Sequence, residues 1–430
     1  MGAAGARFGE HTTMQTRPIL SALRHHKLTA GLLMLQVAFT CAIVCNVVFM
    51  VANRVRQVSL PSGLAESGLS VLQVAGIEQG ENPQTRHAAD LAALRAIPGV
   101  AAAVAVDSLP LSRDESTYGT CGSRQAWDRA MAAHALNGVP GCLSPSIYTG
   151  SPGELAALGL RLVAGRDFLP DEYVPAKPGY VAANVPSAIV TRGLAETLYP
   201  GQDALGQSLY MGGRPPMRIV GVVANLLRPR LRESGMNQYS VLLPSLPGDH
   251  AVTYVLRSAS RDRERVLAAA VETLVRLDPD RLIPPKGMRT YTQIRAAYFQ
   301  RDTTMIGLLS ASVFGLLFVT ALGIAGLANF WVQQRTRSIG IRRAIGATRG
   351  DILRYFQAEN FLIVAAGIVL GALLAVVLNL LLMTHYELPR LPLWYLPVGA
   401  LVLWALGQLS VLSPALHAAK VPPVVATRSV

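Results

Sequence analysis

The chain has 430 residues, of which 51% are hydrophobic and only 15% are charged, and its mean hydropathy is +0.35. This balance argues against a soluble enzyme and favours an integral membrane protein with two or three domains. The net charge of +13 does not indicate nucleic-acid binding, because the chain lacks the alternation of aromatic and basic residues that is typical of nucleic-acid modules.

The N-terminal part of the chain predicts a membrane anchor. Residues 1–27 are polar and basic, and residues 28–53 carry no charge. A run of this length can cross the hydrocarbon layer of roughly 30 Å, which needs about 20 helical residues. A cleaved signal peptide is the alternative, but the run is longer than a usual signal core and no good cleavage site follows it. We therefore expect a permanent first span at 28–53, with residues 1–27 in the cytosol.

Residues 54–300 have the pattern of a folded domain outside the membrane. Strand-like and helix-like stretches alternate, with glycine and proline at the turns. A strand-helix-strand pattern occurs at about 54–107 and again at about 251–300, which predicts one split α+β unit interrupted by an insertion at about 108–250. In the second half, a helix is expected from about residue 262, with Ser260 as its N-cap.

The four cysteines fall into two groups. Cys41 and Cys45 lie in the first apolar run and are expected to be small packing residues. Cys121 and Cys142 lie in the insertion. An oxidising compartment would allow them to form a disulfide, but their spacing cannot show whether their Cα atoms approach within about 7 Å, so the pairing stays open.

Three further charge-free runs predict three more spans, at 303–334, 360–386 and 391–417. The preceding residues 291–300 also look helical, so the second span is expected to extend out of the membrane as a stalk. Two of the spans carry small residues four apart, which allow helices to approach closely in lipid. We favour ordinary helix packing over a pore-lining role for these positions, which are Gly307, Ala311 and Gly315 in the second span and Gly367 and Gly371 in the third.

Residues 335–356, between the second and third spans, form the most basic short segment. They hold six arginines and one acid, Asp351. Short basic loops are retained on the cytosolic side, so both this segment and the tail at 418–430 are expected inside. One interpretation is a loop that fixes topology and contacts anionic lipid. The interpretation we favour is an amphipathic docking helix whose apolar face is formed by Ile339, Ala344, Ile345, Ile352 and Leu353.

The sequence of residues 335–348, Arg-Thr-Arg-Ser-Ile-Gly-Ile-Arg-Arg-Ala-Ile-Gly-Ala-Thr, resembles the loop of the MacB/FtsX family of ABC transporter permeases. Many members have a glutamate where this chain has Ser338. Further pieces resemble the family in the same order along the chain. They are Gly165-Arg166 with Phe168, the Leu-Tyr-Pro-Gly turn at 198–201, Leu-Gly-Gln at 205–207, Val-Gly-Val-Val at 220–223 and the Pro-Ala-x-x-Ala-Ala ending at 414–419.

The resemblance implies an α-helical membrane protein with four transmembrane helices and a large α+β periplasmic domain. This domain would consist of a porter-like split βαβ unit, at about 54–107 and 251–300, with an inserted, mainly-β subdomain at 108–250. The loop would couple the permease to an ATPase. The coupling residues carried over from the family motif are Arg337, Ile339, Gly340, Ile341, Arg342, Arg343, Gly346, Ala347 and Thr348.

The resemblance also implies partners and an output. The partners would be a cytosolic ABC ATPase, a second permease copy or paralogue, membrane lipids, and a periplasmic adaptor with an outer-membrane channel. Export of a small molecule or peptide is the first expectation, followed by lipoprotein release and control of a cell-wall hydrolase. A membrane-anchored periplasmic sensor without transport is the alternative from another class.

The sequence offers no chemistry of its own for ATP hydrolysis. None of its four lysines precedes Ser or Thr, so it has no Gly-x-x-x-x-Gly-Lys-Ser/Thr phosphate loop. It also lacks the His and Cys spacings of zinc sites and the Gly-x-Ser-x-Gly motif of hydrolases. We therefore expect no catalytic residue, metal or cofactor in this chain, and ATP hydrolysis on a separate subunit.

Overall fold

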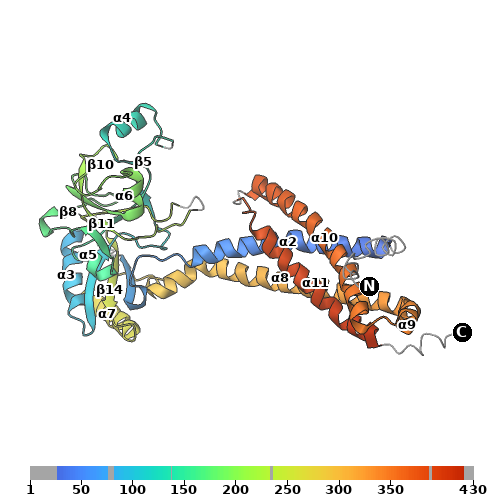
Figure 1. Cartoon of the computed structure of the whole chain (residues 1–430). Helices are drawn as coiled ribbons and strands as arrows, with labels where there is room; N and C mark the ends of the chain where they lie inside the picture. The colour runs from blue at the N-terminus through green and yellow to red at the C-terminus, as the bar shows by residue number, and fades with distance from the viewer. Residues whose placement is uncertain (1–26, 76–81, 137, 233–235, 387–389, 421–430) are drawn as a thin grey trace, which may run out of the picture. The chain divides into compact units, whose positions relative to one another are not determined.

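The computed structural model describes residues 27–75, 82–136, 138–232, 236–386 and 390–420, and most of the N-terminal segment and of the tail lies outside these ranges. The chain divides into two units, each described by itself. The helical unit comprises Met1–Val58 and Asp302–Val430, and the α/β unit comprises Ser59–Arg301 (Figure 1).

Four long helices make up most of the described part of the helical unit. They are α2 (Lys27–Val58), α8 (Tyr291–Gln334), α10 (Arg349–Tyr386) and α11 (Tyr395–Lys420), with the short α9 (Thr336–Ala344) between α8 and α10. Each long helix is long and apolar enough to cross a membrane. α8 has 44 residues, because the polar residues 291–302 continue the helical hydrogen bonding beyond the apolar run. The expected continuity of residues 291–300 with the following apolar run is therefore present as one unbroken helix.

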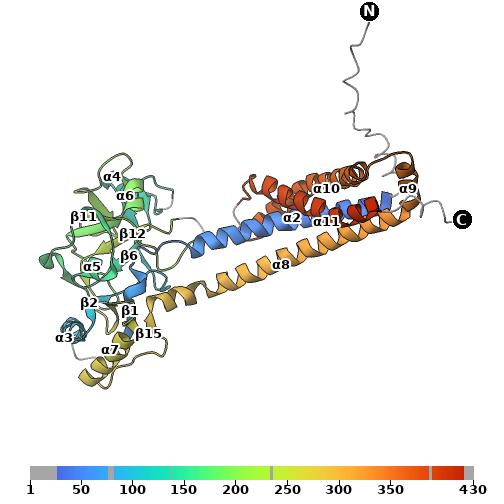
Figure 2. The same ribbon diagram turned by 60° about the horizontal axis from the view of Figure 1, so that its bottom comes forward.

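The long helices pack through their apolar faces. α10 contacts both α2 and α11, and Figure 2 shows these three helices alongside one another. The buried residues of this cluster include Leu33 and Val37 on α2 and Val364 on α10. Cys41 and Cys45 are buried free cysteines, as their position in an apolar run predicts.

The α/β unit contains a four-stranded sheet in the order β15-β1-β14-β2, in which all neighbouring strands are antiparallel. β1 and β2 are therefore parallel to each other and separated by β14, which confirms the split α+β architecture. The elements are β1 (Leu69–Ala75), α3 (Pro83–Arg95), β2 (Val100–Val106), β14 (Ala251–Ser258), α7 (Arg263–Leu277) and β15 (Met288–Thr290).

The two faces of this sheet bury different clusters. Leu72 and Val74 of β1 pack with α3 and α7, whereas Leu69 and Val71 point to the opposite face and pack with the insertion. This follows from the alternation of side chains along a strand. The expected N-cap of α7 is wrong. The helix is preceded directly by Asp262, which makes no side-chain capping bond, because the chain turns into the helix two residues after Ser260.

The insertion is built mainly of strands. A nine-stranded mixed sheet has the order β3-β6-β12-β9-β11-β10-β4-β5, with β7 paired to β11, and β8 and β13 form a separate pair. The strands are β3 (Ser116–Thr117), β4 (Thr120–Cys121), β5 (Cys142–Leu143), β6 (Ser146–Thr149), β7 (Leu162–Gly165), β8 (Val174–Pro175), β9 (Ser187–Thr191), β10 (Ser208–Met211), β11 (Met217–Val223), β12 (Ser240–Leu243) and β13 (Ser245–Leu246). The helices of the insertion are α4 (Arg124–Ala132), α5 (Glu154–Leu158) and α6 (Arg192–Leu198), and a short 3-10 turn lies at Pro170–Glu172. Another 3-10 turn, at Glu66–Gly68, directly precedes β1.

Candidate functional site

The segment 335–356 is not one helix but consists of α9, a short turn and the first residues of α10. α9 ends at Ala344, and Gly346 follows with φ +106°, a backbone conformation that favours glycine. Thr348 directly precedes α10 and caps it. Its hydroxyl accepts from the Asp351 N–H at 3.2 Å, while the Asp351 carboxylate accepts from the Thr348 N–H at 3.0 Å. This reciprocal capping fixes the entry into α10.

The isoleucines of this segment point in two directions. Ile339 and Ile352 are 5% and 6% exposed and pack into the helical unit. Ile341 is 48% exposed and Ile345 is 81% exposed. The expectation of a single apolar face is therefore wrong. Ile339 and Ile345 are six residues apart, which places them far apart around a helix, whereas Ile341 and Ile345 are four apart and adjacent. We call Ile341 and Ile345 the exposed isoleucine pair.

The other predicted coupling residues also divide by exposure. Gly340 is buried beside Ile339, and Ala347 is half-buried. Exposed positions are Arg337, Gly346 and Thr348. Arg342 and Arg343 belong to α9, and their side chains lie outside the described part of the chain. The exposed members and the isoleucine pair together give the segment a surface that is both apolar and basic.

An ion pair anchors this segment to the helical unit. Arg335, between α8 and α9, donates from Nη1 to Oε2 of Glu359 on α10 at 2.8 Å. The Glu359 side chain is only 3% exposed. A carboxylate buried among apolar helices is tolerated when it is paired, so the pair joins the end of α8 to α10. Sequence reasoning missed this contact. The available signal was an arginine directly after one apolar run and a glutamate directly before the next.

The two sets of small residues behave differently. A Cβ built on Gly367 would lie 2.9 Å from the Cβ of Val37, and one built on Gly371 would lie 2.5 Å from the Cβ of Cys41. Both glycines thus let α10 approach α2 closely. Gly307 and Gly315, by contrast, have no described atom within 4 Å of such a Cβ. With Ala311 they leave an exposed face of small residues on α8.

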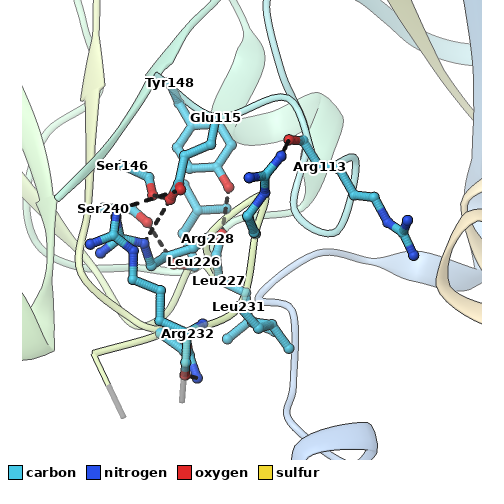
Figure 3. Close-up of polar contacts among 12 residues, drawn as sticks. Arg113, Glu115, Ser146, Tyr148, Leu226, Leu227, Arg228, Leu231, Arg232 and Ser240 are labelled. Atoms are coloured by element: carbon cyan, nitrogen blue, oxygen red, sulfur yellow. Dashed lines mark hydrogen bonds and ion pairs between the residues drawn. The ribbon is translucent and has the colours of Figure 1, made fainter. Parts of the chain in front are cut away.

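In the α/β unit, a buried ion pair organises the loop after β11 (Figure 3). The Arg228 side chain is 1% exposed, and its Nε lies 2.7 Å from Oε1 of Glu115. Ser146 donates its hydroxyl to the same carboxylate oxygen at 2.6 Å. Burial alone would raise the pKa of Glu115, but hydrogen bonds from Ser146 and Arg228 outweigh it and hold the pKa below its ordinary value.

The same loop forms hydrogen bonds to the first and to the last residues of the α/β unit, near Ser62 and Tyr298. The Leu227 N–H donates to the Ser62 carbonyl at 3.0 Å, just after α2. The Leu231 N–H donates to the hydroxyl of Tyr298, on the early part of α8, at 2.9 Å. Tyr148 of β6 donates its hydroxyl to the Leu227 carbonyl (Figure 3). We call residues 225–232 with Glu115 the arginine joint. It fastens the insertion to the segments that enter and leave the unit.

Cys121 and Cys142 form a disulfide between the paired strands β4 and β5, with their Cα atoms 4.1 Å apart. The bond closes the segment that carries α4, whose Ala126 and Ala130 pack against it. The sequence had left this pairing open. No group of three or more His, Cys, Asp or Glu side chains suited to a metal ion occurs in the described ranges.

Comparison with known families identifies both parts of the chain. The model described as MacB-like periplasmic core domain matches residues 30–284, and the model described as FtsX-like permease C-terminal matches residues 310–423.

Several known proteins are similar over much of the chain. A protein of Paracoccus denitrificans named macrolide export ATP-binding/permease protein MacB 1/2 is 28% identical over 95% of this chain and 57% of its own length. The corresponding MacB of Sodalis glossinidius is 28% identical over 63% of this chain and 41% of its own length. The chain thus spans about half the length of these relatives. An uncharacterized ABC transporter permease of Bacillus subtilis, YknZ, is 25% identical over 64% of this chain and 68% of its own length.

Among solved structures, the periplasmic region of MacB from Actinobacillus actinomycetemcomitans aligns with a TM-score of 0.34 at 13% identity. This alignment covers 55% of this chain and 94% of that one.

Proposed function

The chain belongs to the MacB/FtsX family of ABC transporter permeases, and from this premise we propose that it is the permease subunit of an inner-membrane exporter driven by a separate ATPase. The observation that carries this proposal is the segment 335–356. It lies between two membrane-type helices and exposes an isoleucine pair among arginines. Apolar residues exposed beside cations are suited to docking a protein, because exposed apolar patches mark interaction sites and arginine is common in protein interfaces.

The proposed topology follows from charge. The six arginines of 335–356 favour the cytosol, which also places both ends of the chain inside and the α/β unit in the periplasm. The four long helices would be the spans at 28–53, 303–334, 360–386 and 391–417.

The proposed mechanism is mechanical. An ATPase dimer docks on α9 through the exposed isoleucine pair and the surrounding arginines. Its movement during ATP binding and hydrolysis passes to α8 and α10, which are joined there by Arg335 and Glu359. Because α8 is a continuous helix, it can carry this movement as a rigid body to the periplasmic side. The arginine joint then links the helix to the insertion.

We further propose a second permease copy or paralogue on the exposed face of α8. Three small residues on this face are exposed, namely Gly307, Ala311 and Gly315. A Cβ built on either glycine would have no described atom within 4 Å. Small residues on a membrane helix favour close approach of another helix. This face therefore suits a partner helix, with ordinary packing rather than pore lining as its role.

The proposed output is export of a small molecule or peptide through a periplasmic adaptor and an outer-membrane channel. The MacB relatives are named as macrolide export proteins, which supports this class. Lipoprotein release is the alternative within the family, and a periplasmic sensor is the alternative outside it.

Co-purification tests the central claim. We expect the full chain, isolated in mild detergent, to retain a P-loop ATPase. The double change Arg342→Glu with Arg343→Glu should abolish this retention, because it reverses two charges on α9. A matched control is Arg263→Glu with Arg265→Glu at the start of α7, which changes the same charges on the α/β unit. A wild-type chain that retains no ATPase, or an α9 variant that retains it fully, would contradict the proposal.

A further inference from the structure

A cavity of about 380 Å³ lies in the α/β unit along one face of α3. The helix contributes Gln84, His87, Ala88, Leu91 and Arg95, which follow one another at helical spacing. The four-stranded sheet covers only part of this face, since Ala88 and Arg95 are exposed. Ligand pockets typically measure about 300–1,000 Å³. The cavity is thus large enough for a small organic molecule and too small for a folded partner.

The opposite wall comes from the insertion. It includes Ser151, Pro170 and Tyr173, together with Leu246 and Pro247 at the end of the β8–β13 pair (β8 and α3 are labelled in Figure 1). The two walls rest on different hydrophobic clusters, since α3 packs on one face of the four-stranded sheet and Tyr173 packs on the other cluster. Boundaries between separately packed subdomains are common places for ligands.

The lining is apolar with a few fixed polar groups. His87 is 5% exposed, and its Nδ1 has no hydrogen-bond partner among the described residues. Burial lowers the pKa of His87, so the ring is neutral near pH 7. Tyr173 is half-buried and contributes to the cavity wall.

The charge of the lining has one sign. No described lining residue is acidic, and Arg95 is a permanent cation. Its Nε and Nη2 both donate to the Ala103 carbonyl, at 3.1 and 2.9 Å, so its guanidinium is held in place before any ligand arrives. Glu154, a carboxyl close to Tyr173, has its pKa raised by burial to about 8 and carries little charge near pH 7.

We propose that this cavity binds a small apolar organic anion, such as an aromatic carboxylate, with its carboxylate toward Arg95 and its ring against Leu91, Leu246 and Pro247. This goes beyond the proposed function, because it concerns binding by the chain alone and requires neither ATPase nor transport.

The test uses the full chain in nanodiscs of zwitterionic lipid, with radiolabelled naphthoate as the probe and an excess of unlabelled naphthoate to define specific binding. Uncharged naphthalenemethanol, which has the same ring system, serves as the neutral probe. Ala88→Trp fills the cavity from an exposed position. Ala89→Trp is the matched control, since Ala89 is also exposed on α3 but does not line the cavity.

We expect Ala88→Trp to weaken naphthoate binding by about tenfold or more, and Ala89→Trp to leave it unchanged. Arg95→Gln should remove the preference for naphthoate over naphthalenemethanol while the neutral probe still binds. Thermal melting of each variant shows whether the fold is intact. The proposal is overturned if naphthoate binding to the wild type is absent or insensitive to Ala88→Trp, or if both probes bind equally well. It is also overturned if a protein binds at the cavity instead and Ala88→Trp abolishes that binding.

Discussion

The Glu115–Arg228 pair holds two charges where neither would be stable alone. The Arg228 side chain is 1% exposed and that of Glu115 is 10% exposed. Removing water from both ions is costly, and their mutual attraction with the hydrogen bond from Ser146 offsets that cost. The pair therefore stabilises the fold only while both partners are present, and loss of one partner leaves the other charge buried and unpaired.

We predict that Arg228→Met destabilises the α/β unit by about 3–5 kcal/mol, because it leaves the Glu115 carboxylate buried and unpaired. Adding Glu115→Leu should recover much of this loss. Chemical denaturation of the full chain, followed by hydrogen exchange in β6 and the arginine joint, measures both effects.

The control for this prediction is Arg124→Met. Arg124 pairs with Asp128, but both side chains are exposed, at 71% and 57%. Exposed pairs contribute about 0–1 kcal/mol, so this change should be nearly silent. Equal losses for the two variants would show that burial does not govern the Arg228 contact.

Glu154 is a buried carboxyl without such a partner. It is 2% exposed, and its Oε1 has no hydrogen-bond partner among the described residues. Burial, with smaller contributions from Asp167 and Asp107, raises its pKa from 4.5 to about 8. The folded state thus prefers the protonated acid. Its contribution to stability is complete below pH 4.5 and is lost as the pH rises toward 8.

We predict that Glu154→Gln stabilises the chain more at pH 7.5 than at pH 5, by up to about 1.4 kcal/mol for each pH unit between the two pKa values. Glutamine keeps the shape of the neutral acid but cannot ionise. Melting temperatures at the two pH values measure the difference. Glu196→Gln, at an exposed position of α6, is the control. A stabilisation that does not grow with pH would argue against a protonated Glu154.

At the scale of elements, the contact of α10 with α2 depends on glycine. A Cβ on Gly371 would lie 2.6 Å from the Ala38 carbonyl oxygen, and backbone cannot move away as a flexible side chain can. We predict that Gly371→Leu separates the two helices and destabilises the helical unit by about 1–3 kcal/mol, as overpacking typically does. Unfolding in detergent, monitored by circular dichroism, measures this loss.

Gly307→Leu is the matched control on α8. A Cβ there meets no described atom within 4 Å, so the single chain should keep its stability. If the proposed second copy occupies this face, the same change should lower the fraction of dimer seen by cross-linking. A loss of monomer stability at Gly307 as large as that at Gly371 would contradict this assignment of the two faces.

The elements themselves could largely be predicted from the sequence, because their signals are local. The apolar runs gave the four long helices, and the strand-helix-strand pattern gave the split unit around β1 and β14. The orientation within 335–356 was predicted wrongly, since the list of apolar residues ignored the turn at Gly346 that separates Ile345 from Ile352. Helical periodicity applies only within one unbroken helix.

The arginine joint lay beyond sequence reasoning for a different reason. Glu115 and Arg228 are 113 residues apart. They meet only because β3, which directly follows Glu115, pairs with β6, whose Tyr148 is bonded to the loop after β11. Nothing in the local pattern around either residue indicates this pairing. The Arg335–Glu359 pair, only 24 residues apart at the ends of two apolar runs, was accessible in principle.

At the scale of the whole molecule, the proposed mechanism requires the segment 335–356 and the α/β unit to lie on opposite sides of the membrane. The exposed isoleucine pair must face an ATPase in the cytosol, and the α/β unit must face the periplasm. The chain is suited to a direct test by thiol labelling. Cys41 and Cys45 are buried, and Cys121 and Cys142 are joined in a disulfide, so the described cysteines should give little background.

We predict that Ile345→Cys is not labelled by a membrane-impermeant maleimide in intact spheroplasts but is labelled in inverted vesicles, since Ile345 is 81% exposed on the proposed cytosolic side. Tyr180→Cys, which is 72% exposed in the insertion, should show the reverse. Labelling of both variants in detergent confirms that each thiol is reactive. If Ile345→Cys reacts in spheroplasts as readily as Tyr180→Cys does, the segment faces outward, no cytosolic ATPase can reach it, and movement cannot enter the helices there.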